Sequence, residues 1–174
     1  MIRRFINTLF ILGVIQLGAA NSYAQEADST ANPLQNFEFL IGGTWSTDNT
    51  QQTFEWGVGQ KSVVSKLYFS RGDSLQLVGE ITWFWHPGLK QIKGFGTSIE
   101  MQMDFFDYTT VFEGPYKMVN TFMGYGGHID GLPQLETLEF VDENKYLWTY
   151  FNKKGLEFHP AYSITYRRKD ISNK

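Results

Sequence analysis

The strongest structural signal in the chain is the segment Ser74-Leu75-Gln76-Leu77-Val78-Gly79-Glu80-Ile81-Thr82-Trp83-Phe84-Trp85. Every second position, from Leu75 to Trp85, is apolar or glycine, and the intervening positions include serine, glutamine, glutamate and threonine. Side chains of a β-strand alternate between the two faces of a sheet, so this period of two predicts a long strand. Glu80 is expected on the face opposite Trp83 and Trp85.

Short β-rich segments follow one another along the rest of the chain. Turn residues separate them at intervals of roughly 8–12 residues, which is typical of all-β proteins. Arg71-Gly72-Asp73 predicts a tight hairpin, and Asn152-Lys153-Lys154-Gly155 predicts a further turn. The expected strands cover residues 44–49, 52–58, 62–71, 74–86, 90–98, 108–114, 116–124, 134–141, 145–152 and 158–168.

Two architectures fit such a succession of strands, a sandwich and a closed barrel. Residues 145–152 place Tyr146, Trp148 and Tyr150 on one face and Leu147 and Phe151 on the other. A sheet with one wet face alternates apolar and polar side chains, so aromatic groups on both faces argue against it. The short connections therefore predict an antiparallel up-and-down, lipocalin-like barrel of about ten strands.

Composition excludes several functional classes. The chain has 174 residues, 15 Lys and Arg against 18 Asp and Glu, and no cysteine. With a net charge of −3, the protein lacks the strongly basic character that is typical of nucleic-acid-binding proteins. The absence of cysteine excludes thiol catalysis, disulfides and cysteine-based zinc sites. No nucleophile elbow, phosphate-binding glycine loop or His-Glu-x-x-His motif is present.

The N-terminal residues have the three parts of a secretory signal peptide. Arg3 and Arg4 precede a mostly apolar segment over residues 5–20, and Ser22-Tyr23-Ala24 offers a cleavage site before Gln25. The apolar segment is shorter than the roughly 20 residues that a membrane span needs. We expect a signal peptide over 1–24, a flexible tail over 25–33, and one barrel domain over 34–170 that begins with a short helix. The protein is then periplasmic or secreted.

Glycine, tryptophan and proline positions along the chain resemble a known group of proteins. Phe39-Leu40-Ile41-Gly42-Gly43-Thr44-Trp45 is similar to the Gly-x-Trp entry of the calycin superfamily, which includes the lipocalins. Phe54-Glu55-Trp56, Gly59, Val63-Val64-Ser65, Gly79, Trp83 with Pro87, and Gly94 with Gly96 follow in the order seen in bacterial lipocalin-like domains of unknown function (the DUF1579 type). A more distant resemblance is to nitrobindin-like haem-binding barrels.

The resemblance implies a structural role for residues at the two ends of the domain. Gly43 lets the backbone bend at the barrel end, and Trp45 fills that end with a large ring. In lipocalins an arginine of the last strand lies over this tryptophan. Arg167 and Arg168 stand at the corresponding place, so we expect one guanidinium to pack on the Trp45 indole.

Histidines are the candidates for cofactor chemistry. Nitrobindin-like barrels carry their haem ligand at the start of the last strand, and His159 occupies a similar place here. Ser46-Thr47-Asp48-Asn49 lacks the glycines that follow the first tryptophan in those proteins, and Pro160 is a further departure. His128 and Asp130 lie in a glycine-rich segment that predicts a loop, so we predict no metal site and no cofactor, with haem as the alternative.

The predicted barrel suggests a binding protein. We expect its interior to hold a small apolar or amphipathic molecule, its one expected partner, against aromatic side chains: Trp56, Trp83, Trp85, Phe112, Trp148 and Tyr150. A haem-binding or acid/base enzyme in the same cavity is one alternative. A filled, non-catalytic barrel that acts through its surface is another. A strand carboxylate that points inward would acquire a raised pKa, and Glu55, Glu80 and Glu113 are the candidates considered. The sequence leaves the ligand, the catalytic activity and the oligomeric state open.

Overall fold

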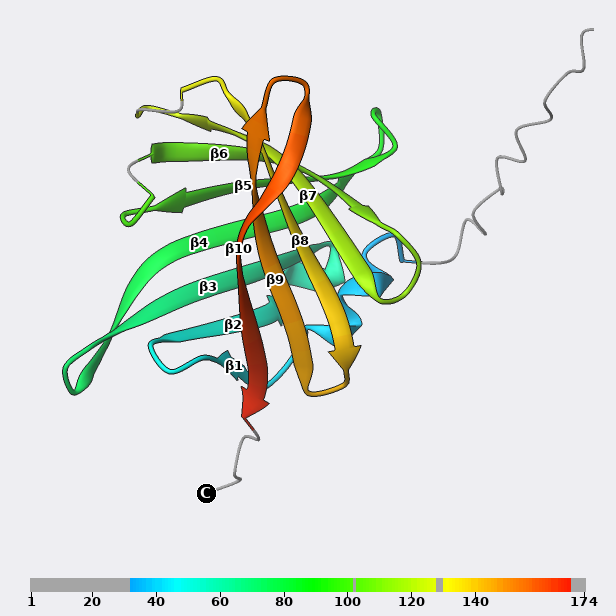
Figure 1. Ribbon diagram of the computed structural model, residues 1–174. Helices are drawn as coiled ribbons and strands as arrows, with labels where there is room; N and C mark the ends of the chain where they lie inside the picture. The colour runs from blue at the N-terminus through cyan, green and yellow to red at the C-terminus, as the bar shows by residue number, and fades with distance from the viewer. Residues whose placement is uncertain (1–31, 102, 128–129, 170–174) are drawn as a thin grey trace, which may run out of the picture. The chain divides into compact units, whose positions relative to one another are not determined.

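The computed structural model describes residues 32–101, 103–127 and 130–169. Figure 1 shows that these residues form a barrel of antiparallel strands with very little helix. The expected signal peptide and residues 25–31 of the expected tail lie outside the described residues, as do His128 and residue 170.

The described residues form ten strands and two short 3-10 helices. The helices are η1 (Gln35–Phe39) and η2 (Val58–Gln60). The strands are β1 (Thr44–Ser46), β2 (Thr50–Trp56), β3 (Ser62–Arg71), β4 (Ser74–His86), β5 (Gln91–Ser98), β6 (Met103–Phe112), β7 (Lys117–Tyr125), β8 (Pro133–Asp142), β9 (Lys145–Lys154) and β10 (Glu157–Lys169).

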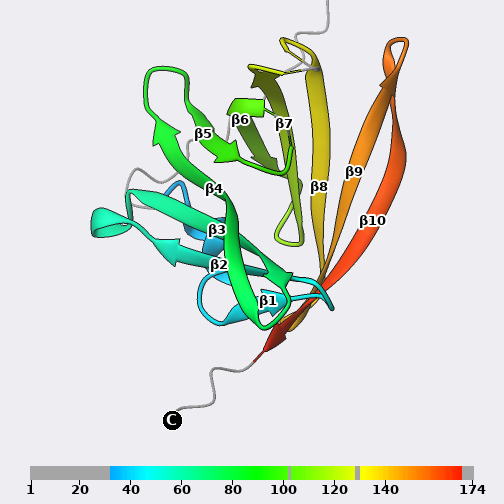
Figure 2. The same ribbon diagram turned by 90° about the vertical axis from the view of Figure 1, so that its left-hand side faces the viewer.

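Each strand pairs with its neighbour in the sequence, and the first and last strands close the barrel. The order around the sheet is β1-β10-β9-β8-β7-β6-β5-β4-β3-β2, with every pair antiparallel (Figure 2). Closure is made by three residue pairs between β1 and β10, including Trp45 opposite Arg168. This is an up-and-down barrel rather than a sandwich, because no connection skips a strand.

Eight of the ten expected strands have bounds within two residues of those observed, and two differ by more. The expected strand over 44–49 ends at Ser46, because the Thr47 side chain accepts backbone hydrogen bonds from Asn49 and Thr50 and forms a turn. The strand expected to begin at residue 108 begins at Met103. The residues that lengthen the start of this strand include Asp107. Its carboxylate forms an ion pair with Lys93 on β5, with 2.8 Å between Oδ1 and Nζ.

One end of the barrel interior is filled by side chains from η1 and its flanks. Phe37 is fully buried, with its ring 5.4 Å from that of Trp83 and 5.1 Å from that of Phe112. Leu34 and Leu40 join the same buried cluster. This is the end at which the β4–β5, β6–β7 and β8–β9 connections lie.

Trp45 occupies the filled end beside the barrel closure. Its indole N–H donates a hydrogen bond to the Leu40 carbonyl at 2.9 Å, and its ring lies 4.8 Å from that of Tyr146. The Arg168 guanidinium lies over the indole, 4.4 Å from the ring centroid, which is the packing expected from the sequence. Arg167 is exposed, and its carbonyl accepts a hydrogen bond from the Ser46 hydroxyl.

Gly43 fits closely against the same arginine. Its φ of +70° lies in the left-handed region that favours glycine. A Cβ atom at this position would lie 3.1 Å from the Arg168 side chain. Gly43 therefore both bends the chain into β1 and leaves room for the side chain that covers Trp45.

Candidate binding cavity

A cavity of about 220 Å³ lies inside the barrel, next to the filled end; it is partly open, and we call it the enclosed cavity because it is more closed than the second pocket described below. Its walls come from inward-facing positions on β2 to β10, and they are mostly aromatic and aliphatic. Small side chains at inward positions, among them Ser65, Gly79 and Ser98, leave the space that larger residues would occupy. Ten strands enclose a wider interior than the eight that side chains alone can fill.

A chain of polar side chains crosses four neighbouring strands at the cavity wall. The Thr110 hydroxyl on β6 donates to the Asn120 side-chain oxygen on β7 at 2.6 Å. The Asn120 amide donates to Glu136 Oε1 on β8 at 2.8 Å. The Trp148 indole N–H on β9 donates to Glu136 Oε2 at 2.9 Å. Each carboxylate oxygen of Glu136 thus accepts one hydrogen bond from the protein.

Strand register explains why these groups meet. Thr110 lies opposite Asn120, and Asn120 lies opposite Glu136, so all three point to the same face. Trp148 is opposite Leu138, two residues beyond Glu136 on the same face. Diagonal neighbours of this kind lie within reach of a long aromatic side chain. The network is therefore built into the pairing of β6 to β9.

Burial dominates the electrostatics of Glu136. The residue is 8% exposed, and removal from water raises the pKa of its carboxyl group. The hydrogen bonds from Asn120 and Trp148 favour the carboxylate and oppose this shift in part. Among the described residues no lysine, arginine or histidine forms an ion pair with Glu136.

Tyrosines surround the carboxyl group. Burial raises the pKa of Tyr108, and the nearby Glu136 raises it further. Burial and the nearby Glu136 also raise the pKa of four other tyrosines, and neighbouring tyrosines raise it further in two of them. The four lie on β9 and β10: Tyr146, Tyr150, Tyr162 and Tyr166. These hydroxyl groups are neutral at neutral pH, so they place no charge near Glu136.

Further polar groups line the cavity away from Glu136. Gln52 accepts a hydrogen bond from the Tyr146 hydroxyl at 2.7 Å and donates one to Ser65 at 2.9 Å. The Trp83 indole N–H is buried and has no hydrogen-bond partner among the described residues. A buried donor without a partner is costly, so Trp83 is a group that a bound molecule could satisfy.

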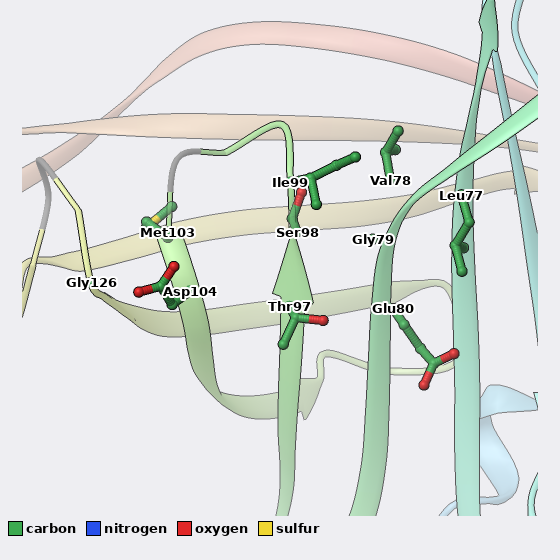
Figure 3. Close-up of a pocket in the computed structure, with 10 residues that line it drawn as sticks. All are labelled: Leu77, Val78, Gly79, Glu80, Thr97, Ser98, Ile99, Met103, Asp104 and Gly126. Atoms are coloured by element: carbon green, nitrogen blue, oxygen red, sulfur yellow. The ribbon is translucent and has the colours of Figure 1, made fainter.

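A second, more open pocket of about 650 Å³ adjoins the cavity at the other end of the barrel. Figure 3 shows its lining on β4, β5 and β6, with Gly126 beyond β7. Gly79, Thr97 and Ser98 line both spaces. We take the enclosed cavity as the candidate site because it is the one that combines buried aromatic walls with a buried carboxyl group.

Two of the six predicted aromatic binding residues line the enclosed cavity, Trp83 and Trp148. Trp56 and Phe112 do not, because they pack against the core at the filled end. Trp85 is 36% exposed at the end of β4 and lies outside the lining. Tyr150 packs beside the lining, and its hydroxyl donates a hydrogen bond to Gln134.

His159 is placed away from the cavity. It lies on β10 opposite Asn152, with its side chain 48% exposed and 3.6 Å from the Glu157 carboxylate. The cavity lining includes no histidine among the described residues, so the arrangement does not fit a haem held by His159. Within the same residues, no group of three or more histidine and acidic side chains is gathered as for a metal ion.

Sequence reasoning missed Glu136, the polar centre of the cavity. Its segment is Pro133-Gln134-Leu135-Glu136-Thr137-Leu138-Glu139-Phe140. Alternation along a strand puts Glu136 on the same face as Leu138 and Phe140. It also puts Glu139 on the same face as an apolar residue, Leu135. The carboxylates considered instead, Glu55, Glu80 and Glu113, are all exposed. Phe140 is larger than Leu135, so the face that Glu136 shares with Phe140 is the better candidate for the buried face.

Comparison with protein-family models and with curated proteins found no match to this chain. Across the described segments, the structure contains no helix that is long and apolar enough to span a bilayer.

Proposed function

We propose that the barrel binds a small, largely apolar molecule in the enclosed cavity. The observation that carries this proposal is the cavity itself, about 220 Å³ of space with aromatic and aliphatic walls and a few polar groups. Small-molecule sites have this composition, in which apolar walls supply most of the contact and a few polar groups fix orientation. An engineered apolar cavity of about 150 Å³ holds benzene, so the present one accommodates a ring with a short substituent.

The open pocket is the entry route in this proposal. It adjoins the cavity through Gly79, Thr97 and Ser98, at the end of the barrel opposite η1. The filled end is blocked by Phe37 and Trp45, both buried. A ligand that arrives through the open pocket would meet Gly79 and Thr97 before it reaches the aromatic walls.

The resemblance to lipocalin-like calycins and the secretory leader belong to the same proposal. Support for the resemblance comes from the closed up-and-down barrel and from Arg168 over Trp45. A cleaved leader over residues 1–24 would place the barrel outside the cytoplasm, where a carrier could collect its ligand.

An acid/base enzyme is the second candidate, and one observation favours it. Glu136 is buried, lines the cavity and has a raised pKa, which are properties of carboxyl groups that exchange protons during catalysis. The two candidates differ in outcome, because a binding protein releases its ligand chemically unchanged and an enzyme does not. The filled-barrel alternative is less well supported, because about 220 Å³ of the interior is not occupied by side chains.

Native mass spectrometry of the protein, purified without denaturation from its exporting host, tests the proposal. We expect a mass above that of the polypeptide, and its loss at high collision energy. Leu67→Trp places a large ring in the cavity lining and should remove the excess mass. Leu89→Trp, at an exposed turn residue outside the lining, should retain it. A wild-type protein that shows only the polypeptide mass, and whose melting temperature is unchanged by millimolar benzyl alcohol, would contradict the proposal.

A further inference from the structure

The charged side chains that line the cavity are all acidic. Within the described part of the chain they are Glu100 and Glu136. The Glu100 carboxylate forms an ion pair with Arg71 on β3. Glu136 has no such partner among the described residues, although it is the more deeply buried of the two.

Glu136 has room to bind one more group. A carboxylate offers about four lone-pair positions, and the protein uses one on each oxygen, through Asn120 and Trp148. Nine-tenths of the residue is buried, and a buried carboxylate without a cationic partner is costly. Burial raises the pKa of Glu136, which is the response of a carboxyl group that lacks a countercharge.

The walls around Glu136 also suit a positive charge. Trp83, Tyr108, Trp148, Tyr162 and Tyr166 all line the cavity with aromatic rings. The faces of such rings attract ammonium groups, and sites for organic cations combine several of them. The tyrosines are neutral at neutral pH, and each carries a raised pKa partly because Glu136 is near.

We propose that the ligand is a small organic cation, a protonated amine with an apolar body, whose ammonium group binds Glu136 while its body packs against the aromatic walls. This inference rests on the proposed function, since it names the chemical class of the molecule that the cavity takes. The ammonium donates its hydrogen bonds to the free lone pairs of Glu136. The volume of the cavity limits the body to one ring or an alkyl group of similar size.

Three probes of matched size and different charge test the inference by isothermal titration calorimetry at pH 7. They are benzylamine, which is cationic, benzyl alcohol, which is neutral, and benzoate, which is anionic. The ammonium adds a charge-assisted hydrogen bond to Glu136, so benzylamine should bind the wild-type protein about ten-fold or more tightly than benzyl alcohol. Benzoate should bind most weakly, because Glu136 repels it.

Glu136→Gln should remove the preference for the cation, so that benzylamine binds this variant no more tightly than benzyl alcohol does. Retained benzyl alcohol binding then shows that the variant keeps its cavity. Glu139→Gln is the matched control, because Glu139 is an exposed residue of the same strand and lies outside the lining. It should keep the full preference for benzylamine.

The outcomes distinguish failure of the inference alone from failure of the proposed function. Equal or tighter binding of benzyl alcohol or benzoate by the wild-type protein would overturn the inference and leave the cavity as a binding site. A benzylamine preference that survives in Glu136→Gln would overturn the assignment to Glu136. Failure of all three probes to bind would overturn both the inference and the proposed function.

Discussion

Replacing Trp45 with alanine is expected to lower the free energy of unfolding by about 3–5 kcal/mol, the usual cost of truncating a buried tryptophan. Trp45 is 1% exposed, and its ring packs on Tyr146 and lies beneath Arg168. Its loss also removes the hydrogen bond to the Leu40 carbonyl, at the junction between η1 and β1. Domains of this size have about 5–15 kcal/mol of stability in total, so the variant should lose a large fraction of it.

Urea denaturation followed by circular dichroism measures this effect. Trp85→Ala is the matched control, because Trp85 is partly exposed at the end of β4, and its cost should be about 1 kcal/mol. Arg168→Met keeps an apolar stem over the indole and removes the guanidinium, with an expected cost of about 0.5–2 kcal/mol. Equal stability losses in Trp45→Ala and Trp85→Ala would contradict the role assigned to Trp45.

Glu136→Gln is expected to become more stable relative to the wild-type protein as the pH rises. Burial raises the pKa of Glu136 in the folded protein above the value of 4.5 that an unperturbed glutamate has. The folded state therefore favours the protonated form, and the contribution of Glu136 to stability is fully present below the unfolded pKa. It is lost as the pH rises through the folded pKa, with a slope of at most about 1.4 kcal/mol per pH unit.

The hydrogen bonds of the network are kept in this variant if the side-chain amide of Asn120 flips, so that its nitrogen and oxygen exchange places. The amide group introduced by Glu136→Gln can donate to the Asn120 oxygen, while the Asn120 amide donates to the Thr110 hydroxyl, which also accepts. The side-chain oxygen that the substitution retains still accepts from Trp148. Urea denaturation from pH 4 to pH 8 measures the difference, with Glu139→Gln as the exposed control. A difference between wild type and Glu136→Gln that does not change with pH would contradict the account.

Much of the fold follows from local patterns. The segment from Ser74 to His86 is one strand, as its period of two predicts, and the bounds of β3 and β4 agree with the expected ranges. The expected start of β6 at residue 108 was wrong, because the strand begins at Met103 and includes the acidic residues Asp104 and Asp107. In the structure Phe106 faces the interior, whereas Asp107 faces outward and pairs with Lys93 on the neighbouring strand. A charge on the outer face of a barrel strand is stable in water, so local polarity did not mark a turn.

The cavity was harder to predict than the strands around it. Inward positions at the filled end and at the cavity carry similar aromatic residues, so sequence cannot separate Phe112, which packs in the core, from Trp148, which lines the space. Whether an inward side chain packs in the core or lines the cavity depends on its position along the barrel axis. The strand register and the closure of the barrel determine that position. Glu136 was missed because its two hydrogen bonds come from Asn120 on β7 and Trp148 on β9, and neither partner is local in sequence.

The central claim is that a ligand binds inside the barrel, and the indole N–H signals of the five tryptophans test it most directly. In ¹H–¹⁵N correlation spectra recorded during addition of benzylamine, the signals of Trp83 and Trp148 should shift, because both indoles line the cavity. The signals of Trp45, Trp56 and Trp85 should move much less, since these residues lie outside the lining. Shifts confined to Trp85, or no shift at Trp83 and Trp148 up to saturating probe, would contradict the claim.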